Sequence, residues 1–352
     1  MRALSLGILA VIAATAFVGQ AWLRAAPAEA PPPGEAALRA ATAACTRTRA
    51  RIPGGVLGIS DPHADDPGVI DLIAATGVHW VRAEFYWRKI EPVPGAGYHW
   101  AHYDAMVKAY ARRGIRIQAI LTYMPDSLPP DWSQRAAAFE RFTAAAVRRY
   151  APLGVHLWEV FNEPNLPGYG WLTRGNDTRA NLDGYVLMLA AANRAMRKND
   201  PKAVVLIGGM ASDQHRGLPV ETTMARVYRL GARNCFDVMA FHPYGYQGRF
   251  GAARARIDAL LEKAGDSDKP VWFNEYGWTE QKAMDMARNP GAAGNPMLRA
   301  LEQRTVADAF FWFSAKDYSS RYGTPAFGLA TYKLERRPSF YTFRHFVEGL
   351  RQ

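Results

Sequence analysis

Short apolar runs typical of buried strands recur along the chain, and longer segments separate them. The eight runs occupy residues 56–59, 79–82, 117–121, 157–161, 204–207, 238–241, 271–273 and 311–313. Turn-forming residues stand just before several of the runs, at Gly77, Gly114, Gly154 and Pro270. The intervening segments include three with the apolar spacing of amphipathic helices, at 135–150, 181–197 and 297–308. A strict alternation of eight strands with helices predicts an α/β fold, the (β/α)8 TIM barrel.

A doubly wound α/β sheet is the alternative for a chain that alternates strands and helices. That fold is usually marked by a glycine-rich phosphate-binding turn after a strand, and no run here is followed by one. We therefore predict a single barrel domain over residues 51–352.

The N-terminus has the features of an export signal. Arg2 precedes an apolar run from Ala3 to Val18 that continues to Leu23. A positive start and a short apolar core are typical of a secretory signal, and small-x-small cleavage sites occur at 19–21 and 26–28. Residues 3–23 are also about long enough to cross a bilayer uncleaved. We expect a signal peptide or membrane anchor at 1–24, a Pro/Ala-rich linker and lead-in segment at 25–50, and a periplasmic or extracellular protein that is tied to the inner membrane if the segment is retained.

Composition and charge narrow the class of protein. Of 352 residues, 49% are hydrophobic and 21% are charged, which is ordinary for a globular protein. The formal charge of +11 raises the question of nucleic-acid binding, but Lys and Arg are scattered and no nucleic-acid motif is present. Solvated basic faces are the simplest interpretation. The alternative is an affinity for an anionic polymer, either an acidic polysaccharide or a membrane surface.

Two cysteines are too few for a disulfide-built scaffold or a thiolate zinc site. Cys235 lies just before the run at 238–241, and Cys45 about ten residues before the first run. Both positions belong to the N-terminal end of the barrel, away from the catalytic face. In an oxidising compartment we predict a Cys45–Cys235 disulfide, with two small buried hydrophobic residues as the alternative.

Barrel enzymes carry their chemistry at the carboxyl ends of the strands. Polar or aromatic residues at these ends are Arg82, Glu84, Tyr123, Asn162, Glu163, His242, Tyr244, Asn274, Glu275 and Trp312. Glu163 and Glu275 thus project from the fourth and seventh strands across one barrel mouth. Cleavage of a glycosidic bond needs one group that protonates the leaving oxygen and another that meets the positive charge on the sugar. Two glutamates serve both roles when their surroundings separate their pKa values.

Three segments carry a family resemblance. Residues 158–165 (WEVFNEPN), 241–244 (FHPY) and 271–278 (VWFNEYGW) resemble the strand-end motifs of clan A, the retaining barrel glycoside hydrolases. The resemblance covers about residues 54–348. Within the clan it is most similar to family 39 and its neighbours, including bacterial exopolysaccharide-associated endoglycosidases.

The resemblance implies that Glu163 is the acid/base and Glu275 the nucleophile. It further implies that Asn162 binds the 2-hydroxyl of the sugar and that Arg82 keeps the nucleophile ionised. Tyr244 and His242 would form hydrogen bonds near the nucleophile, and Trp312 would form the floor of the sugar subsite. The resemblance implies no metal or organic cofactor. The expected partner is a polysaccharide or oligosaccharide, and we expect a monomer.

Aromatic residues near the strand ends favour an open groove for a long glycan over a closed pocket. They are Tyr86, Trp87, Tyr123, Tyr169, Trp171, Tyr246 and Trp278, and we include Tyr123 and Trp278 among the substrate-binding residues. Residues 166–178 would form one wall of this groove. Loop packing is the alternative for about half of these rings. The composition of the acidic loop at 61–66 suggests a metal site. Asp and Pro also form turns and helix caps, and we favour a turn here.

Two classes of function fit these residues. One is an exported, endo-acting retaining glycosidase that cleaves a bacterial exopolysaccharide. The other is a non-catalytic barrel that binds polysaccharide in a surface or export assembly. A binding protein has no need for both Glu163 and Glu275 beside Asn162, so we favour the enzyme. Glycan transfer is a third possibility that the same residues would serve.

Overall fold

The computed structural model describes residues 34–166, 178–212, 217–246, 249–279, 295–318 and 326–351. The expected signal or anchor at 1–24 lies outside the described residues, as do Tyr169, Trp171 and nearly all of the expected groove wall at 166–178. None of the described helices combines the length and the apolar character that a membrane span requires.

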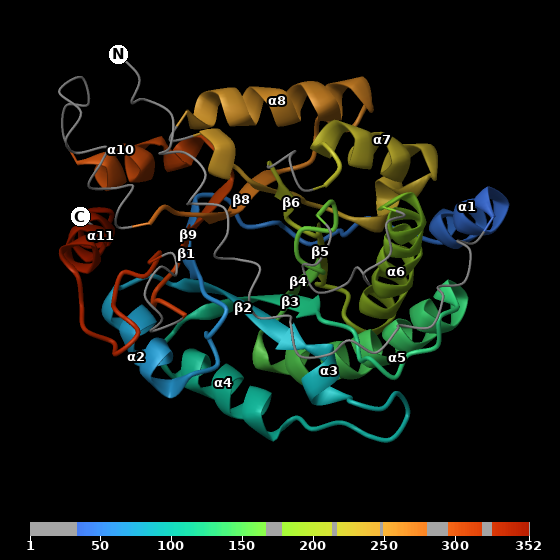
Figure 1. The fold of residues 1–352 in the computed structure, drawn as a ribbon, viewed down its shortest axis with the longest axis horizontal. Coiled ribbons are helices and arrows are strands. Elements are labelled where there is room, and N and C mark those ends of the chain that lie inside the picture. Colours follow the sequence, from blue (N-terminus) through green and yellow to red (C-terminus); the bar gives the residue numbers. More distant parts are fainter. Residues whose placement is uncertain are drawn as a thin grey trace, which may run out of the picture.

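A ring of parallel strands forms the centre of the molecule, and helices surround it (Figure 1). The strands of the described part are β1 (Val56–Ser60), β2 (Trp80–Tyr86), β3 (Arg116–Thr122), β4 (Leu157–Val160), β5 (Val204–Ile207), β6 (Met210–Ala211), β7 (Met239–His242), β8 (Val271–Tyr276) and β9 (Ala309–Phe313). They pair in the order β5-β4-β3-β2-β1-β9-β8-β7-β6. The Ile207 N–H donates to the carbonyl of Val238 at 3.2 Å, which brings β5 against β7.

Strand β6 follows β5 after only two residues, so the two share one position in the ring. The described strands therefore fill eight positions, and each of the eight predicted runs overlaps one of them. The predicted single-domain (β/α)8 barrel is confirmed.

The outer layer is helical. It consists of α1 (Glu35–Ala43), α2 (Pro67–Ala75), α3 (Trp87–Ile90), α4 (Ala101–Arg112), α5 (Trp132–Tyr150), α6 (Thr178–Asn199), α7 (Val220–Arg229), α8 (Phe250–Lys263), α10 (Pro296–Glu302) and α11 (Pro338–Gly349). Asp66 and Asp131 cap α2 and α5 through their side chains, which satisfies free N–H groups at those ends. The helix predicted at 297–308 ends earlier, at Glu302. A 3-10 turn (Gln303–Val306) follows because the chain must enter β9 at Ala309.

The barrel lumen changes from apolar to polar along the strands. A separate cluster of buried apolar residues comprises Val56, Trp80, Leu157, Val204, Leu206, Val238, Trp272, Ala309 and Phe311. On β2, Trp80 belongs to this cluster, whereas Val81 and Phe85 pack in the larger core with the helices. Because side chains alternate along a strand, Arg82 and Glu84 share the lumen face with Trp80. The apolar layer therefore closes the lumen below the strand ends, and polar chemistry is confined to the mouth.

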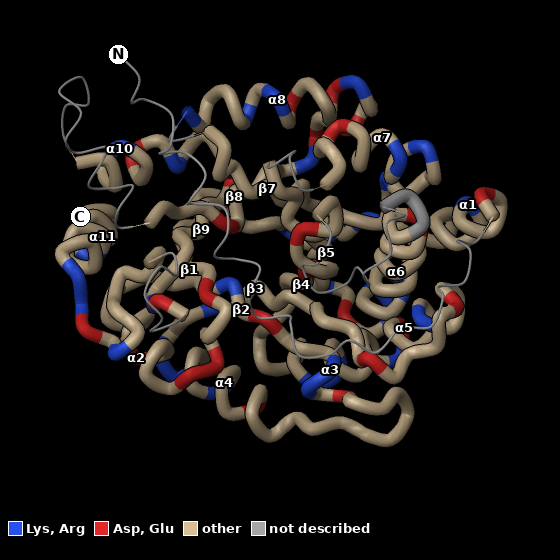
Figure 2. The backbone as a smooth tube through the Cα atoms, viewed as in Figure 1, with Lys and Arg blue, Asp and Glu red and all other residues tan. Residues whose placement is uncertain are grey.

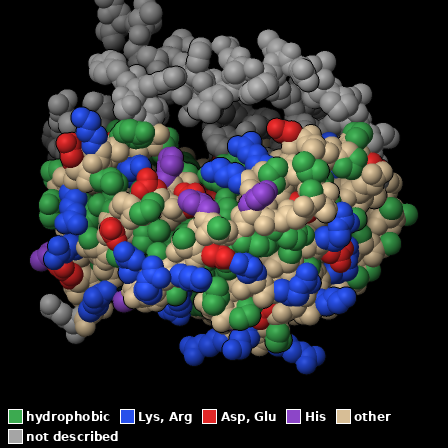
Figure 3. Space-filling model, turned by 90° about the horizontal axis from the view of Figure 1, so that it is seen from below, with side chains coloured by type: hydrophobic (Ala, Val, Ile, Leu, Met, Phe, Trp, Pro, Cys, Tyr) green, Lys and Arg blue, Asp and Glu red, His purple; other side chains and the backbone are tan. Residues whose placement is uncertain are grey.

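Charged residues are distributed over the molecule. In Figure 2, Lys and Arg lie mainly on the helices and connecting segments, while acidic residues also occur at the ends of the central strands. The face seen in Figure 3 carries basic side chains interspersed with acidic and apolar ones. The net charge of +11 is therefore not gathered into one basic surface on this face.

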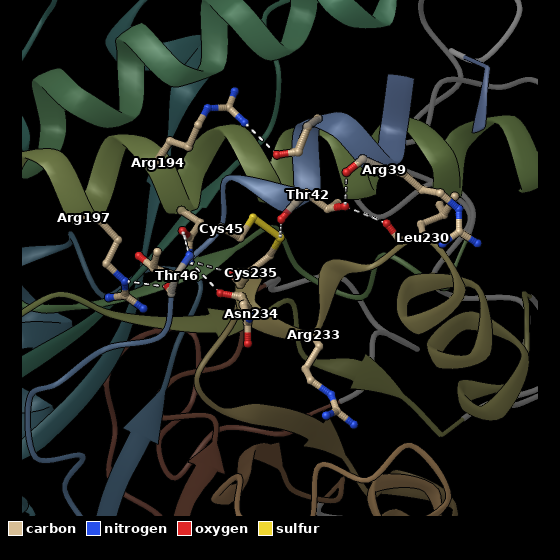
Figure 4. The surroundings of a disulfide bond; sticks show 12 residues. Arg39, Thr42, Cys45, Thr46, Arg194, Arg197, Leu230, Arg233, Asn234 and Cys235 are labelled. Carbon is tan, nitrogen blue, oxygen red and sulfur yellow. Dashed lines mark hydrogen bonds between the residues drawn. A yellow bond between two sulfur atoms is a disulfide. The ribbon is translucent and has the colours of Figure 1, made fainter. Parts of the chain in front are cut away.

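The lead-in segment is fastened to the N-terminal end of the barrel (Figure 4). Cys45 and Cys235 form a disulfide across 190 positions of sequence. The Thr42 hydroxyl donates to the carbonyl of Leu230 at 2.7 Å. The side-chain amide of Asn193, on α6, accepts from the N–H of Thr46 and donates to its carbonyl. The lead-in segment is thus bound both to α6 and to the turn that precedes β7.

We expect protein made in an oxidising compartment to show no free thiol when it is titrated unfolded and without reductant. A Cys45→Ser, Cys235→Ser variant should lose up to about 5 kcal/mol of unfolding free energy, because a bridge across a long loop restricts the unfolded chain. Urea denaturation measures this loss. Two titratable thiols in the wild-type protein would show that these residues only fill space.

Candidate active site

The two strand-end glutamates meet at the barrel mouth. One carboxylate oxygen of Glu163 and one of Glu275 lie within 4.8 Å of each other. Glu163 follows β4 in a segment where two non-glycine residues, Phe161 and Glu163, have positive φ angles of 62° and 44°. Its N–H donates to the carbonyl of Gly209 at 3.1 Å. This unusual backbone, anchored to the connection between β5 and β6, places the Glu163 side chain at the mouth.

A β-bulge brings Glu275 to the same place. Phe273 pairs with Phe310 and Tyr276 with Trp312, so three steps along β8 match two along β9. In a regular strand Asn274 and Glu275 would face opposite sides of the sheet. Here both reach the lumen: the Asn274 amide binds Glu159, and the Glu275 carboxylate binds Arg82.

Arg82 is the centre of the polar layer. Its side chain is 2% exposed, and all five of its N–H groups have acceptors. These bonds are two to the Glu159 carboxylate at 2.8 Å, one to Glu275 Oε2 at 2.7 Å, one to Asn162 Oδ1 at 2.7 Å and one to Ser60 Oγ at 3.0 Å. Burial lowers the pKa of the guanidinium, but the neighbouring carboxylates outweigh burial and raise the pKa overall. The positive charge beside Glu275 is therefore permanent.

Glu159 is a buried carboxylate that the sequence analysis did not single out. It is 0% exposed and accepts from Arg82, from the side-chain amides of Gln118 and Asn274, and from the N–H of Gly209. Its signal in the sequence is that a charged residue stands inside the apolar run 157–161. It lies two positions after Leu157, which faces the lumen, so Glu159 faces the lumen as well. Glu159 orients Arg82 without reaching the open mouth.

The two mouth glutamates have different neighbours. Glu275 accepts from Arg82 through Oε2 and from the Tyr244 hydroxyl through Oε1 at 2.8 Å. Burial and the charge of Glu275 raise the pKa of Tyr244 well above its usual value, so its hydroxyl keeps the proton. Glu163 instead contacts Nδ1 of His242 at 2.9 Å. Burial lowers the pKa of His242 to about 4, so this imidazole is neutral above that pH.

Trp312 does not line the mouth, in contrast to the expectation. It is 1% exposed and packs against Phe343 of α11 and Trp278, at ring distances of 6.2 and 5.1 Å. On β9 the lumen side belongs to Phe311 and, by alternation, Phe313. Phe313 is half-buried beside Tyr244, with ring centroids 6.5 Å apart. The ring at this edge of the mouth is thus Phe313, one position later than expected.

The other aromatic candidates separate into two groups. Trp87 and Trp278 are buried in the core, and the Tyr246 hydroxyl accepts from Arg256 of α8. Tyr86 and Tyr123 are half-buried at the ends of β2 and β3, with ring centroids 4.8 Å apart. Exposed cations lie over both rings, Lys89 over Tyr86 at 4.1 Å and Arg88 over Tyr123 at 5.1 Å. Of the described aromatics expected at the rim, these two tyrosines lie near the carboxyl group of Glu84.

The acidic loop at 61–66 forms a turn and a helix cap. Asp61 accepts the N–H groups of His63, Ala315 and Lys316 at 2.7 to 3.1 Å, and Asp66 caps α2. Among the described residues, the group whose ligand atoms converge closely enough to hold a metal ion is Glu163, His242 and Glu275, which includes both mouth glutamates.

Glu84 adds a third carboxyl group to the mouth. It follows Arg82 on the lumen face of β2, and its buried Oε2 has no hydrogen-bond partner among the described residues. Burial raises its pKa to about 7; the nearby Tyr86 hydroxyl and the charge of Arg82 oppose this rise, and the charge of Glu275 adds to it. Glu84 is therefore largely protonated in mildly acidic solution.

We expect Glu84 to make the protein less stable as the pH rises from about 4.5 to 7. In this window the unfolded chain releases the Glu84 proton and the folded protein retains it, so ionisation favours the unfolded state. A Glu84→Gln variant should match the wild type at pH 4 and exceed its unfolding free energy by about 3 kcal/mol at pH 8. Urea denaturation of both proteins at both pH values measures this difference. Other titrating groups, such as Asp61, contribute equally in the two proteins, so their effects cancel. An equal effect of the substitution at both pH values would contradict this assignment.

Sequence comparison gives the family. A family model described as cellulase (glycosyl hydrolase family 5) matches residues 48–318. The chain belongs to glycosyl hydrolase family 5. This membership identifies a glycoside hydrolase of clan A, as the motifs indicated. No curated protein matches the chain.

Solved structures of glycoside hydrolases share the fold. A family 39 glycoside hydrolase from Bacteroides cellulosilyticus WH2 has 17% identity and a TM-score of 0.62, covering 85% of this chain and 64% of that one. A monomeric β-xylosidase from Caulobacter crescentus CB15 has 16% identity and a TM-score of 0.62, covering 86% and 69%. The exo-β-1,4-mannosidase Op5Man5 from Opitutaceae bacterium strain TAV5 has 18% identity and a TM-score of 0.60, covering 87% and 61%. The family 5 chain thus spans about two thirds of the length of these proteins.

Proposed function

We propose that this family 5 protein is a retaining glycosidase that cuts within an exopolysaccharide outside the cytoplasm. Glu163 is the acid/base and Glu275 the nucleophile. The observation that carries the proposal is the approach of their carboxylate oxygens to within 4.8 Å. Retaining glycosidases hold the two carboxyl groups about 5–5.5 Å apart, whereas inverting enzymes need about 6.5–9.5 Å to admit a water molecule.

The surroundings of Glu275 suit a nucleophile. A carboxylate can attack the anomeric carbon only in its ionised form, and a permanent cation at 2.7 Å favours that form. The Tyr244 hydroxyl holds the other oxygen and orients the carboxylate. In the first step Glu275 bonds to the anomeric carbon while Glu163 protonates the departing glycosidic oxygen.

The surroundings of Glu163 suit an acid that later becomes a base. In the mouth it contacts the imidazole of His242, which burial keeps uncharged. In the second step Glu163 takes a proton from water, and the resulting hydroxide displaces Glu275 from the sugar. Asn162, whose Oδ1 is held by Arg82, is placed to donate its amide hydrogens to the 2-hydroxyl. A non-catalytic binding protein would not require this asymmetry between two glutamates.

Three features support a long glycan as substrate. Tyr86 and Tyr123 form a ring pair at one side of the mouth, and Phe313 lies at the end of β9. Arg88 and Lys89 over the tyrosine rings would favour a polymer with acidic groups outside the cleavage subsite. The Arg2-led apolar segment and the Cys45–Cys235 bridge support an exported protein, where such polymers occur.

We expect Glu163→Gln and Glu275→Gln each to lower the hydrolysis rate by several orders of magnitude on a natural polymer. With an activated aryl glycoside the Glu163→Gln loss should be smaller, because a good leaving group needs little protonation. Azide should partly rescue that variant by attacking the glycosyl-enzyme, and the glycosyl azide should keep the configuration of the cleaved bond. Rates and proton NMR of the product measure these effects.

The matched control is Glu262→Gln, which removes an exposed carboxylate on α8 and should leave the rate unchanged. Thermal unfolding of each variant checks that the fold persists. Wild-type activity in Glu163→Gln or Glu275→Gln would exclude the proposed roles, and an inverted product would make Glu275 a base that acts through water.

We further expect cleavage within the polymer and not at its ends. The protein should be screened on a panel of bacterial exopolysaccharides, with Glu275→Gln as the blank. An endo-acting enzyme lowers viscosity early and releases a range of oligosaccharides, since it cuts at internal sites. Release of one monosaccharide at nearly constant viscosity would show exo action, the mode of the mannosidase that shares the fold.

A further inference from the structure

Glu84 is a carboxyl group at the barrel mouth that has no part in the two-step mechanism. It lies two positions after Arg82 on β2, so it shares the lumen face from which the Arg82 guanidinium reaches Glu275. Two residues advance about 6.6 Å along a strand, which places Glu84 above the Arg82 layer, on the open side. The residue is partly exposed, whereas its Oε2 is buried and has no hydrogen-bond partner among the described residues.

Two neighbouring donors are committed to other acceptors. All five N–H groups of Arg82 are bonded to other side chains. The Tyr86 hydroxyl has a single proton, and it donates to the carbonyl of Pro62 at 3.1 Å. Neither group holds Oε2 of Glu84. The fold therefore places a carboxyl group in the mouth without bonding this oxygen, although an unpaired buried carboxyl is unfavourable.

Accessibility distinguishes Glu84 from Thr122, another lumen residue with an unpaired oxygen. Thr122 lies on the adjacent strand β3, in alternation with Gln118, which binds Glu159 in the lumen. Its Oγ1 has no partner among the described residues, but the residue is 0% exposed, so a molecule in the mouth does not reach it. Glu84 is within reach. A molecule bound in the mouth can supply the hydrogen bonds that the fold does not.

The chemistry around Glu84 suits a sugar. A carboxyl group offers two oxygens as acceptors, and a sugar ring presents several hydroxyl groups that donate and accept. Burial raises the pKa of Glu84 to about 7, so below that pH the group can also donate. Tyr86 and Tyr123 lie near this carboxyl, with ring centroids 4.8 Å apart, and add apolar ring surface.

We propose that Glu84 binds hydroxyl groups of the sugar whose bond is cut, other than the 2-hydroxyl assigned to Asn162. This inference rests on the proposed function and adds a substrate-binding residue to it. Glu84 stands on the strand whose Arg82 bonds both Glu275 and Asn162, so it meets the same sugar ring as they do. In the free protein the unpaired carboxyl lowers stability, and a bound sugar relieves this loss.

Variants of Glu84 separate substrate binding from folding. Glu84→Leu removes both oxygens, whereas Glu84→Gln keeps a hydrogen-bonding group of similar size. We expect Glu84→Leu to be at least as stable to urea as the wild type at pH 8. On the exopolysaccharide that the wild type cleaves, its kcat/KM should nevertheless fall about 10- to 100-fold, as expected when hydrogen bonds to a substrate are lost. Glu84→Gln should recover part of this loss.

Thr122→Val is the matched control, because it removes an unpaired oxygen from the lumen face of the adjacent strand. It should leave kcat/KM unchanged. A Glu84→Leu protein that is less stable than the wild type but equally active would show that Glu84 is a structural residue. A stable Glu84→Leu protein with wild-type activity would also overturn the inference.

Deoxy sugars locate the contact. The substrates are 2,4-dinitrophenyl glycosides of the sugar at the cleavage site, each lacking the hydroxyl at carbon 3, 4 or 6. Removal of a hydroxyl that Glu84 binds should lower kcat/KM in the wild type and have little further effect in Glu84→Leu, since the two groups act as a pair. Equal effects of every deoxy substitution in both proteins would overturn the inference.

Binding without turnover separates this inference from the proposed function. Native affinity electrophoresis in gels with and without each polysaccharide compares Glu275→Gln with the double variant Glu275→Gln, Glu84→Leu. We expect weaker retardation of the double variant. That result, together with a wild type that hydrolyses none of the polysaccharides, would contradict the proposed function and leave the Glu84 contact standing. Hydrolysis by the wild type with equal retardation of both variants would overturn the Glu84 contact and leave the proposed function standing.

Discussion

The buried guanidinium of Arg82 is the group on which the polar half of the barrel depends. Its five hydrogen bonds reach Ser60, Glu159, Asn162 and Glu275, on or next to three strands other than its own. Two of these partners are carboxylates that would otherwise repel each other in a lumen of low polarity. Removing one member of such a buried network leaves an uncompensated charge, which costs about 3–5 kcal/mol. One side chain thus links the strands at the barrel mouth and supplies a positive charge there.

Arg82 also makes the two mouth glutamates unequal. Glu275 lies against the cation, whereas Glu163 lies against an imidazole that burial keeps neutral. Two carboxyl groups of the same type, with oxygens within 4.8 Å of each other, thus have different hydrogen-bond partners. The apolar layer beneath them, which includes Trp80 and Trp272, closes the lumen and strengthens these electrostatic differences.

The repetitive part of this architecture could be predicted from sequence because it follows from local rules. Strand runs, turn signals and helical spacing located all eight barrel positions, and the polar residues after the strands indicated the mouth. Which face a residue takes was harder to predict. The segment Phe310-Phe311-Trp312-Phe313 is apolar throughout, so no polar position marks its lumen side, and the larger ring of Trp312 was taken for the subsite. Glu159 was passed over for a related reason: its partners come from other strands, and only the closed ring brings them together.

The remaining unpredicted features share a physical cause, since each is a departure from regular strand geometry. The bulge in β8 puts adjacent residues on one side of the sheet, and the positive φ angles at Phe161 and Glu163 turn the chain as it leaves β4. Neither feature has a marker such as glycine at the affected position, so tertiary contacts must maintain both. Those contacts are the bonds of Asn274 and Glu275 to Glu159 and Arg82, and the bond from the Glu163 N–H to Gly209. The polar network therefore stabilises the irregular backbone that positions its own members, and this mutual dependence is why local sequence rules locate the mouth but not its geometry.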